Sequence, residues 1–323
     1  MITQANQDKL VTIFGGSGFL GRHVVRALCK EGYRIRVAVR RPDLTGHLQP
    51  LGRVGQVHAV QANLRHPPSV EAAVRGADIV INLVGILFER GRQSFAAVQA
   101  QGPELAARAA ERAGARVIHV SAIGADAQSE SLYAQSKAAG EAAVLAAAPD
   151  AVIFRPSILF GPEDSFFNRF AGMARFSPFL PLIGGGTTRF QPVFAGDVAQ
   201  AIAKAANGRA RHGTIYELGG PEVKTFRQLM EFVLATIERK RLLLPLPFRV
   251  AEMQATLLEL MPTPLLTRDQ VRLLKTDNVV SEGAQRQGRT IEDLGIDPVS
   301  FAAIVPSYLW RFRKTGQFRS KPA

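Results

Sequence analysis

The sequence predicts an α/β protein with a doubly wound parallel sheet and a smaller, mainly helical C-terminal lobe. Short runs rich in β-branched residues alternate with alanine-rich helical runs from Leu10 to Phe154. This alternation is the pattern that builds a parallel sheet covered by helices on both faces. A glycine-rich turn directly follows the first of these runs. After Pro156 the regular alternation stops, and the chain becomes richer in Pro, Phe and Gly.

The expected elements follow from this alternation in chain order. Strands are expected at 11–14, 34–39, 57–61, 79–84, 117–121 and 152–155. Helices are expected between them at 20–30, 69–74, 104–113 and 133–147. We therefore place a first domain at 1–155 and the C-terminal lobe at 156–323. A regular helical pattern returns at 189–208, and we expect this segment to rejoin the first domain.

Length and composition are those of a soluble globular protein. The 323 residues are 46% apolar, which is enough for one large domain or two joined ones with a substantial core. The polar start lacks the zones of a secretory signal, and no stretch reaches the roughly 20 apolar residues of a spanning helix. We therefore expect a cytoplasmic protein without an integral membrane span. The single cysteine, Cys29, excludes an internal disulfide and a cysteine-rich metal site.

The charge balance indicates anionic partners. The chain carries 40 Lys and Arg against 27 Asp and Glu, a net charge of +13, which attracts phosphorylated ligands, anionic lipid, nucleic acid or an acidic protein. The basic residues are dispersed and lack the interleaved aromatics of a base-stacking surface, so no nucleic acid is expected. The tail 299–318 mixes aromatic and basic side chains. It could meet a membrane surface or a partner, or pack on its own domain.

The first expected strand leads directly into the turn Gly15-Gly-Ser-Gly-Phe-Leu-Gly21, which opens a helix. Gly15 permits the sharp turn, Gly18 lets the backbone approach a pyrophosphate, and Gly21 lets the helix lie close to the strand. The free N–H groups of the helix start then face the phosphate charge. The context predicts a Rossmann-type dinucleotide site whose turn residues are Gly15, Ser17, Gly18, Phe19, Leu20 and Gly21.

Basic residues follow the second expected strand, where an NAD-binding domain carries an acidic residue against the ribose 2′-hydroxyl. Here the chain has Arg40 and Arg41. A carboxylate would repel a 2′-phosphate, whereas an arginine offers it a bidentate, charge-assisted clamp. NADPH is therefore the expected cofactor, with Arg22 as a further cation on the same side. Either arginine could instead be a solvated turn residue.

Two further loops are expected to flank the adenine and the second ribose. The first holds Asn63 and Leu64 after the third strand, and the second holds Val84 and Gly85 after the fourth. Either segment could be an ordinary loop.

A catalytic constellation is expected where the fifth strand ends. Tyr133 and Lys137 are four residues apart, so a helix places them on one face. A free tyrosine has a pKa of about 10, so it exchanges protons at neutral pH only if a neighbouring cation lowers that pKa. Ser121 ends the fifth strand, where its hydroxyl could hold a substrate carbonyl or alcohol. The three residues are expected to line the cofactor, whether or not they turn over a substrate.

Together with the segment Arg155-Pro-Ser-Ile-Leu-Phe-Gly-Pro162, these residues resemble the extended short-chain dehydrogenase/reductases over nearly the whole chain. The segments 154–168, 181–183 and 191–198 more narrowly resemble the nucleotide-binding accessory subunits of respiratory complex I, of alphaproteobacterial type. Two positions depart from the pattern of many extended reductases. Gln99 begins a run that is often Asn-Val-x-Gly-Thr, and Asn63 stands where many relatives have an aspartate.

The resemblance implies a tightly held NADPH with a structural or stabilising role. It implies that Pro156, Ser157 and Ile158 also border the cofactor. It further implies complex I subunits as partners and a peripheral position at the membrane surface near the quinone region, on the cytoplasmic face of the inner (plasma) membrane. An independent NADPH-dependent reductase or epimerase of a small carbonyl or sugar-nucleotide substrate remains the alternative.

Overall fold

A computed structural model describes residues 6–262 and 264–316 of the chain, which divides into two compact units. The first unit consists of Met1–Pro156, Ala195–Leu218 and Ser281–Asp297. The second consists of Ser157–Phe194, Gly219–Val280 and Pro298–Ala323. The chain therefore crosses between the units several times, and each unit is described by itself.

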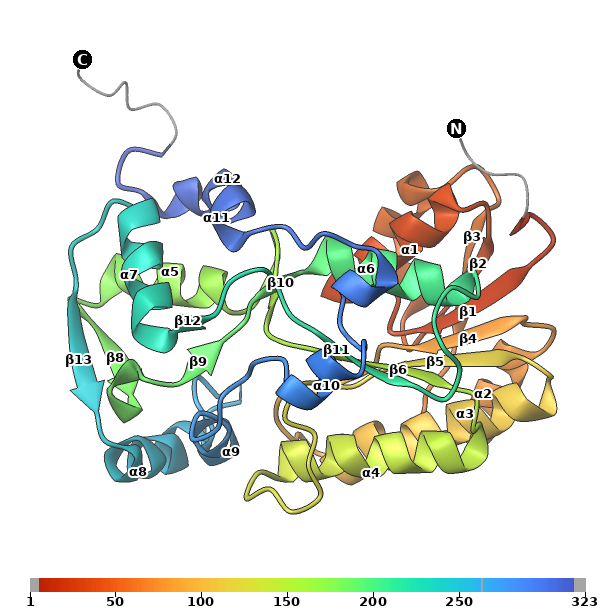
Figure 1. Ribbon diagram of the computed structural model, residues 1–323, viewed down its shortest axis with the longest axis horizontal. Coiled ribbons are helices and arrows are strands. Elements are labelled where there is room, and N and C mark those ends of the chain that lie inside the picture. The colour runs from red at the N-terminus through yellow and green to blue at the C-terminus, as the bar shows by residue number, and fades with distance from the viewer. Residues whose placement is uncertain (1–5, 263, 317–323) are drawn as a thin grey trace. The chain divides into compact units, whose positions relative to one another are not determined.

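The first unit is built on a seven-stranded parallel sheet with the order β11-β6-β5-β4-β1-β2-β3 (Figure 1). Its strands are β1 (Leu10–Phe14), β2 (Arg34–Val39), β3 (Val57–Gln61), β4 (Ile79–Asn82), β5 (Arg116–Val120), β6 (Val152–Pro156) and β11 (Ile215–Leu218). The sheet grows outward from β1 in both directions, so the strand order reverses between β1 and β4. In open α/β sheets, ligands bind outside the carboxyl ends of the strands at such a switch point. The predicted fold class is confirmed.

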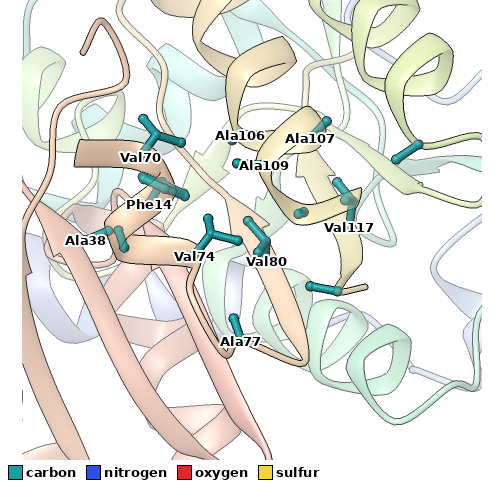
Figure 2. Close-up of a cluster of buried hydrophobic side chains, with 14 of the residues drawn as sticks. Phe14, Ala38, Val70, Val74, Ala77, Val80, Ala106, Ala107, Ala109 and Val117 are labelled. Atoms are coloured by element: carbon teal, nitrogen blue, oxygen red, sulfur yellow. The ribbon is translucent and has the colours of Figure 1, made fainter. Parts of the chain in front are cut away.

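Helices cover both faces of this sheet. One face carries α2 (Pro67–Val74), α3 (Gly102–Arg112) and α4 (Leu132–Ala147), whose small apolar side chains pack on Phe14, Val80 and Val117 (Figure 2). Alanine on α3 allows close helix-sheet packing, because no long side chain separates the two layers. Helices α1 (Phe19–Lys30) and α6 (Ala195–Ala206) contact each other. The remaining helical segments of this unit are short: α10 (Glu282–Arg286), η2 (Pro42–Leu44), η3 (Gly46–Leu51), η4 (Ala96–Gln101) and η6 (Glu292–Leu294).

The observed strands agree with most of the expected ranges. The strands at 34–39 and 57–61 have the predicted bounds, whereas the strand expected at 79–84 ends at Asn82. Of the segment 189–208, α6 belongs to the first unit and Arg189–Phe190 to the second. The sequence did not indicate β11 or the return of Ser281–Asp297 to the first unit.

The second unit combines short paired strands with helices around an aromatic core. Its strand pairs are β7 (Leu159–Phe160) with β10 (Val193–Phe194), β8 (Phe179–Ile183) with β13 (Leu242–Leu246), and β9 (Arg189–Phe190) with β12 (Lys224–Thr225). Its helical segments are α5 (Phe167–Phe176), α7 (Phe226–Thr236), α8 (Phe248–Leu258), α9 (Arg268–Leu273), α11 (Phe301–Ile304), α12 (Pro306–Leu309), η5 (Gly184–Gly186) and η7 (Trp310–Phe312). Capping boxes at Thr225 and Thr267 begin α7 and α9.

The described part of the C-terminal tail packs on the second unit. Phe301, Val305 and Leu309 are buried in its core, and the Phe301 ring stacks on Phe167 at a centroid distance of 6.1 Å. The Tyr308 hydroxyl donates to the Asp164 carboxylate. Of the interpretations open for this tail, the structure thus supports packing on its own domain for the buried apolar residues of 299–316. Positions 317 and 318 lie outside the described residues.

Across 6–262 and 264–316, no helix is long and apolar enough to cross a membrane. The same part of the chain contains no cluster of side chains suited to a metal ion.

Candidate nucleotide-binding site

The turn between β1 and α1 has the geometry of a phosphate-binding loop. Gly15 has a φ of +80°, a left-handed conformation that favours glycine, and its carbonyl accepts from Gly18 N–H at 3.0 Å. Gly18 is the N-cap of α1 and gives it no side-chain hydrogen bond. The first turn of α1 also lacks acidic residues. Its backbone N–H groups and positive dipole end are therefore suited to an anion.

The three glycines fit a dinucleotide for different steric reasons. A Cβ on Gly21 would lie 2.4 Å from the Gly15 carbonyl oxygen and 2.5 Å from the Gly16 carbonyl carbon, so Gly21 allows the helix to meet the turn. A Cβ on Gly15 would press against Val84 Cγ2 at 3.1 Å. A Cβ on Gly18 would contact only the Gly15 oxygen, at 3.3 Å. The fold itself thus requires Gly21, while Gly18 keeps the exposed side of the turn open to a ligand's approach.

The other turn residues lie on or beside this loop. Ser17 is part of the turn and half-buried, while Phe19 and Leu20 form the first residues of α1. The Phe19 ring makes an edge contact with His23, and Leu20 is buried. Leu20 therefore anchors the helix in the core, and the turn reaches the surface at Gly18.

The two arginines after β2 differ in their partners. Arg41 forms a 2.7 Å ion pair with Asp43, and both side chains are exposed. Arg40 donates from Nη1 to the Gln93 amide oxygen at 2.9 Å and has no carboxylate partner within the described ranges. Arg22 Nε lies 3.4 Å from the Gly18 carbonyl oxygen. Of the two predicted clamp residues, Arg40 is thus better placed to bind an anion, because its charge is not already neutralised.

The loops after β3 and β4 are ordered by their own side chains. Asn63 Oδ1 accepts from Arg65 N–H at 3.1 Å, which closes a turn. Leu64 is buried against Gly102 in the core of the first unit. Val84 lies beside Gly15, so the loop after β4 borders the glycine turn. Leu64 therefore has a packing role, while Val84 lies next to the turn predicted to bind phosphate.

Helix α4 places Tyr133 and Lys137 together. Ser131 caps this helix by accepting from Ala134 N–H at 3.3 Å. Lys137 Nζ lies 5.9 Å from the centroid of the Tyr133 ring, and that ring makes an edge contact with Phe95. The predicted spacing thus brings the phenol and the ammonium into one place. Gly85 lies beside them, because a Cβ there would be 3.3 Å from Lys137 Nζ.

Lys137 is a buried cation with few partners. Its Nζ donates to the Val120 carbonyl at 3.4 Å, a long hydrogen bond for a group with three donors. Burial lowers the pKa of Lys137 to about 8, against the opposing effect of Glu141 one helical turn away. The remaining N–H groups are therefore suited to the hydroxyls of a bound ligand.

Two buried polar atoms at the end of β5 have no hydrogen-bond partner among the described residues: Ser121 Oγ and His119 Nε2. An unpartnered buried polar atom costs free energy and often indicates a ligand position. The Ser121 backbone is fixed by donation to the Phe154 carbonyl at 2.7 Å. The hydroxyl of Ser121, the predicted catalytic serine, thus has no partner among the described residues, and the carbonyl of the preceding residue, Val120, accepts from Lys137.

His119 is a site residue that sequence reasoning missed. Asn82 Oδ1 accepts from Val84 N–H at 3.1 Å, which fixes its amide and directs Nδ2 to His119 Nδ1 at 3.3 Å. The imidazole therefore carries its proton on Nε2. Burial, and then the positive charge of Lys137, lower the His119 pKa to about 3. A polar residue at an inward-facing position of a buried strand is the one sequence signal that could have revealed it.

Gln99 supports the same region from η4, a π-helical segment. Its side chain donates to Ser136 Oγ at 3.0 Å and accepts from Ile86 N–H at 3.4 Å. Gly140 on α4 is required here, because a Cβ would lie 2.1 Å from the Gln99 carbonyl oxygen. The glutamine thus joins η4, α4 and the loop after β4. π-Helical turns are frequent at functional sites.

An ion-pair network supports α4 from the sheet. Arg155 on β6 donates to both Glu141 carboxylate oxygens, at 2.8 and 2.6 Å, and lies 3.6 Å from Glu217 on β11. These bonds raise the Arg155 pKa. The network fixes the helix that carries Lys137.

The three residues after Arg155 were also predicted to border the cofactor. Pro156 ends β6, and Ser157 and Ile158 begin the second unit. There the Ser157 hydroxyl and the Ile158 N–H both donate to Asn278 Oδ1, at 2.6 and 3.1 Å.

The arrangement of a glycine turn, a strand-end serine and a paired tyrosine and lysine corresponds to a known family. A model of the NAD dependent epimerase/dehydratase family matches residues 11–219, which is more than half of the chain. The chain belongs to this family. Membership confirms the predicted resemblance to the extended short-chain dehydrogenase/reductases and agrees with a nicotinamide dinucleotide as ligand.

Two curated relatives narrow this placement. The chain is 37% identical to alpha subcomplex subunit 9 of mitochondrial NADH dehydrogenase [ubiquinone] 1 from Arabidopsis thaliana, over 95% of this chain and 79% of the relative. A ceramide reductase from Caulobacter vibrioides is 40% identical over 60% of this chain and 59% of that protein. The first match covers nearly the whole chain, so the chain belongs to the family of that subunit, as the sequence predicted.

A solved structure supports the fold. The dTDP-glucose 4,6-dehydratase of Streptomyces venezuelae, whose structure holds NAD, superimposes with a TM-score of 0.72 at 22% identity, over 94% of this chain and 96% of that one. At this identity the likeness establishes the fold, and the site rests on the residues described above.

Proposed function

We propose that this protein is an accessory subunit of respiratory complex I that holds NADP(H) in a structural role near the membrane. The observation that carries the proposal is the match over nearly the full chain to a mitochondrial subunit of that complex. The glycine turn of the first unit supports its nucleotide part, because Gly15, Gly18 and Gly21 have the geometry that a pyrophosphate requires.

Three parts of the nucleotide have a matching group in this proposal: the pyrophosphate, the 2′-phosphate and the nicotinamide ribose. Backbone amides at the start of α1 bind the pyrophosphate, and Arg40 binds the 2′-phosphate. Lys137, with N–H groups to spare, donates to hydroxyls of the nicotinamide ribose beside Tyr133. When bound, the nicotinamide can exchange a hydride. In a structural role, its binding energy instead stabilises the folded chain by mass action.

Assembly with complex I is tested in native membranes. A tagged chain is expressed in its own host, and mild detergent extracts are separated on a native gel. We expect the tag to migrate with NADH dehydrogenase activity, and its removal to lower the amount of assembled complex. A chain recovered only as a free protein would refute the subunit assignment, whatever its nucleotide content.

An alternative function is favoured by one specific observation. Ser121, Tyr133 and Lys137 are all present, and Ser121 Oγ has no protein partner within the described ranges, as expected of a hydroxyl that receives a substrate oxygen. The Caulobacter relative is named as a reductase of a lipid. An independent NADPH-dependent reductase or epimerase would oxidise NADPH or isomerise a substrate in purified form. Tyr133→Phe should then abolish turnover and leave NADPH binding nearly unchanged.

The proposed location follows from the assembly. As a subunit beside the quinone region, the chain would lie on the cytoplasmic face of the inner (plasma) membrane in peripheral contact with it. The sequence left the tail open as a contact surface or a packed helix, and the buried apolar residues of its described part pack on the core of the second unit. We therefore look for the contact on another surface.

A further inference from the structure

The two-stranded sheet that β8 and β13 form in the second unit has exposed apolar side chains on one face. β8 and β13 run parallel, with Leu242 paired to Phe179. Leu180 and Leu182 point into the aromatic core and are fully buried. Because strand side chains alternate, Phe179 and Leu242 point to the other face, where they are 45% and 68% exposed. An amphipathic strand pair would have polar side chains on this face.

Helix α8, which a single residue separates from β13, also has exposed apolar side chains opposite its buried side. Ala251 and Ala255 are buried against Ile183 and Val271. On its outer side the exposed apolar residues recur at helical spacing, namely Val250, Met253, Leu257 and, just beyond the helix, Leu260. Met253 and Leu257 are 65% and 67% exposed. We call the exposed apolar residues of β8, β13 and α8, together with Leu260, the apolar surface. Its members are Phe179, Leu242, Leu244, Val250, Met253, Leu257 and Leu260.

Cations border the apolar surface on both sides of β13. Arg175, Arg239 and Arg241 lie close enough that the positive charges of Arg241 and Arg175 contribute, after burial, to lowering the Arg239 pKa. Lys240 is exposed between Arg239 and Arg241 in the sequence, and Arg249 is exposed at the other end of β13, in the first turn of α8. None of the five has a carboxylate within ion-pair distance in the described part of the chain. Such a group of like charges is stabilised by an external anion.

Acidic residues near the apolar surface are already neutralised. Glu252 on α8 pairs with Lys275 at 3.2 Å, and Glu259 at the end of α8 pairs with Arg268 at 3.2 Å. The border of the apolar surface therefore has a net positive charge. Exposed apolar side chains next to cations that have no carboxylate partner are typical of segments that lie in the headgroup layer of an anionic bilayer.

We propose that the apolar surface and its bordering arginines and lysine dock this protein on an anionic phospholipid membrane. Phe179, Leu242 and the outer side of α8 enter the headgroup and acyl boundary, and the cations bind lipid phosphates. The inference deepens the membrane-proximal part of the proposed function, and it assigns the contact to 175–260 in place of the tail. A protein partner would instead have to supply both carboxylates and a matching apolar groove.

Vesicle flotation of the full chain tests this. Vesicles of phosphatidylcholine with phosphatidylglycerol should carry the protein, whereas vesicles of phosphatidylcholine should carry much less. Met253→Ser with Leu257→Ser should weaken binding by about ten-fold for each lost side chain. Lys240→Glu with Arg249→Glu should weaken it by at least about 25-fold, from the two lost cations.

The matched control lies in the first unit, where Arg53 and Val54 are an exposed cation and an exposed apolar residue. Arg53→Glu with Val54→Ser should leave flotation unchanged. Equal flotation by the control and both test variants, or binding that ignores lipid charge, would overturn the proposal. So would a change of oligomeric state in the test variants without vesicles, since the apolar surface would then join copies of the chain. Migration with complex I is scored separately, so either idea can fail without the other.

Discussion

The glycine turn gives the sharpest prediction, because Gly18 and Gly21 differ in what a methyl group would meet. A Cβ at Gly21 would lie 2.4 Å from the Gly15 carbonyl oxygen, whereas a Cβ at Gly18 would meet that oxygen at 3.3 Å and nothing else within 4 Å. Gly18 has φ −75° and ψ 179°, which alanine adopts without strain. We therefore expect Gly21→Ala to damage the fold and the nucleotide site together, and Gly18→Ala to damage the site alone.

The magnitudes follow from these distances. An ordinary carbon contact is about 3.5 Å, so the turn must move by about 1 Å to admit Ala at position 21. Overpacking of this kind costs about 1–3 kcal/mol of unfolding free energy, and a shift of about 1 Å in a preorganised site costs about a hundredfold in function. Gly18→Ala should change the unfolding free energy by no more than about 0.5 kcal/mol, while its methyl group blocks the approach of the pyrophosphate.

Both variants are assayed by urea denaturation of the nucleotide-free chain and by NADPH fluorescence titration. Gly46→Ala is the matched control, because a Cβ there meets nothing within 4 Å. Undiminished NADPH affinity in a well-folded Gly18→Ala protein would refute the assignment of the pyrophosphate to this turn.

Three further predictions concern charge, protonation and the tail. Arg40→Asp should weaken the binding of NADPH at least about ten-fold more than the binding of NADH in paired titrations. Arg41→Asp should have a smaller effect, because Arg41 already pairs with Asp43. Equal losses of affinity for both nucleotides would contradict the 2′-phosphate clamp. The lowered His119 pKa, about 3 against 6.5, means that the unfolded chain binds more protons across this window, so stability falls as pH falls through it. His119→Gln should therefore retain about 2–3 kcal/mol more of its pH 7 stability at pH 4.5 than the unmodified chain, and parallel denaturation curves would contradict this. Phe301→Ala should cost about 3–5 kcal/mol in urea denaturation, whereas a cost near zero would mean that the tail does not pack on its unit.

The features that could be predicted from the sequence are encoded locally. The glycine spacing fixes which backbone positions need no Cβ, and Gly15 and Gly21 occupy those positions. The helical repeat alone brings Tyr133 and Lys137 together. The first strands were found because their β-branched runs lie between clear helical runs.

The features that were missed depend on contacts between distant segments. The pairing of Asn82 with His119 needs the register between β4 and β5, which no local pattern specifies. The return of Ser281–Asp297 to the first unit depends on bonds such as Ser281 N–H to Glu217 at 2.8 Å. The apolar residues of α8 resemble those of a core helix, because a sequence pattern shows which residues share a face but not whether another element covers it.

The central claim is that the first unit holds a dinucleotide carrying a 2′-phosphate. Mass spectrometry of the nucleotide released by denaturing the freshly isolated native assembly tests it most directly. We expect NADP⁺ or NADPH at about one molecule per chain. Release of NAD⁺ or NADH instead, or of no nucleotide at all, would contradict the claim.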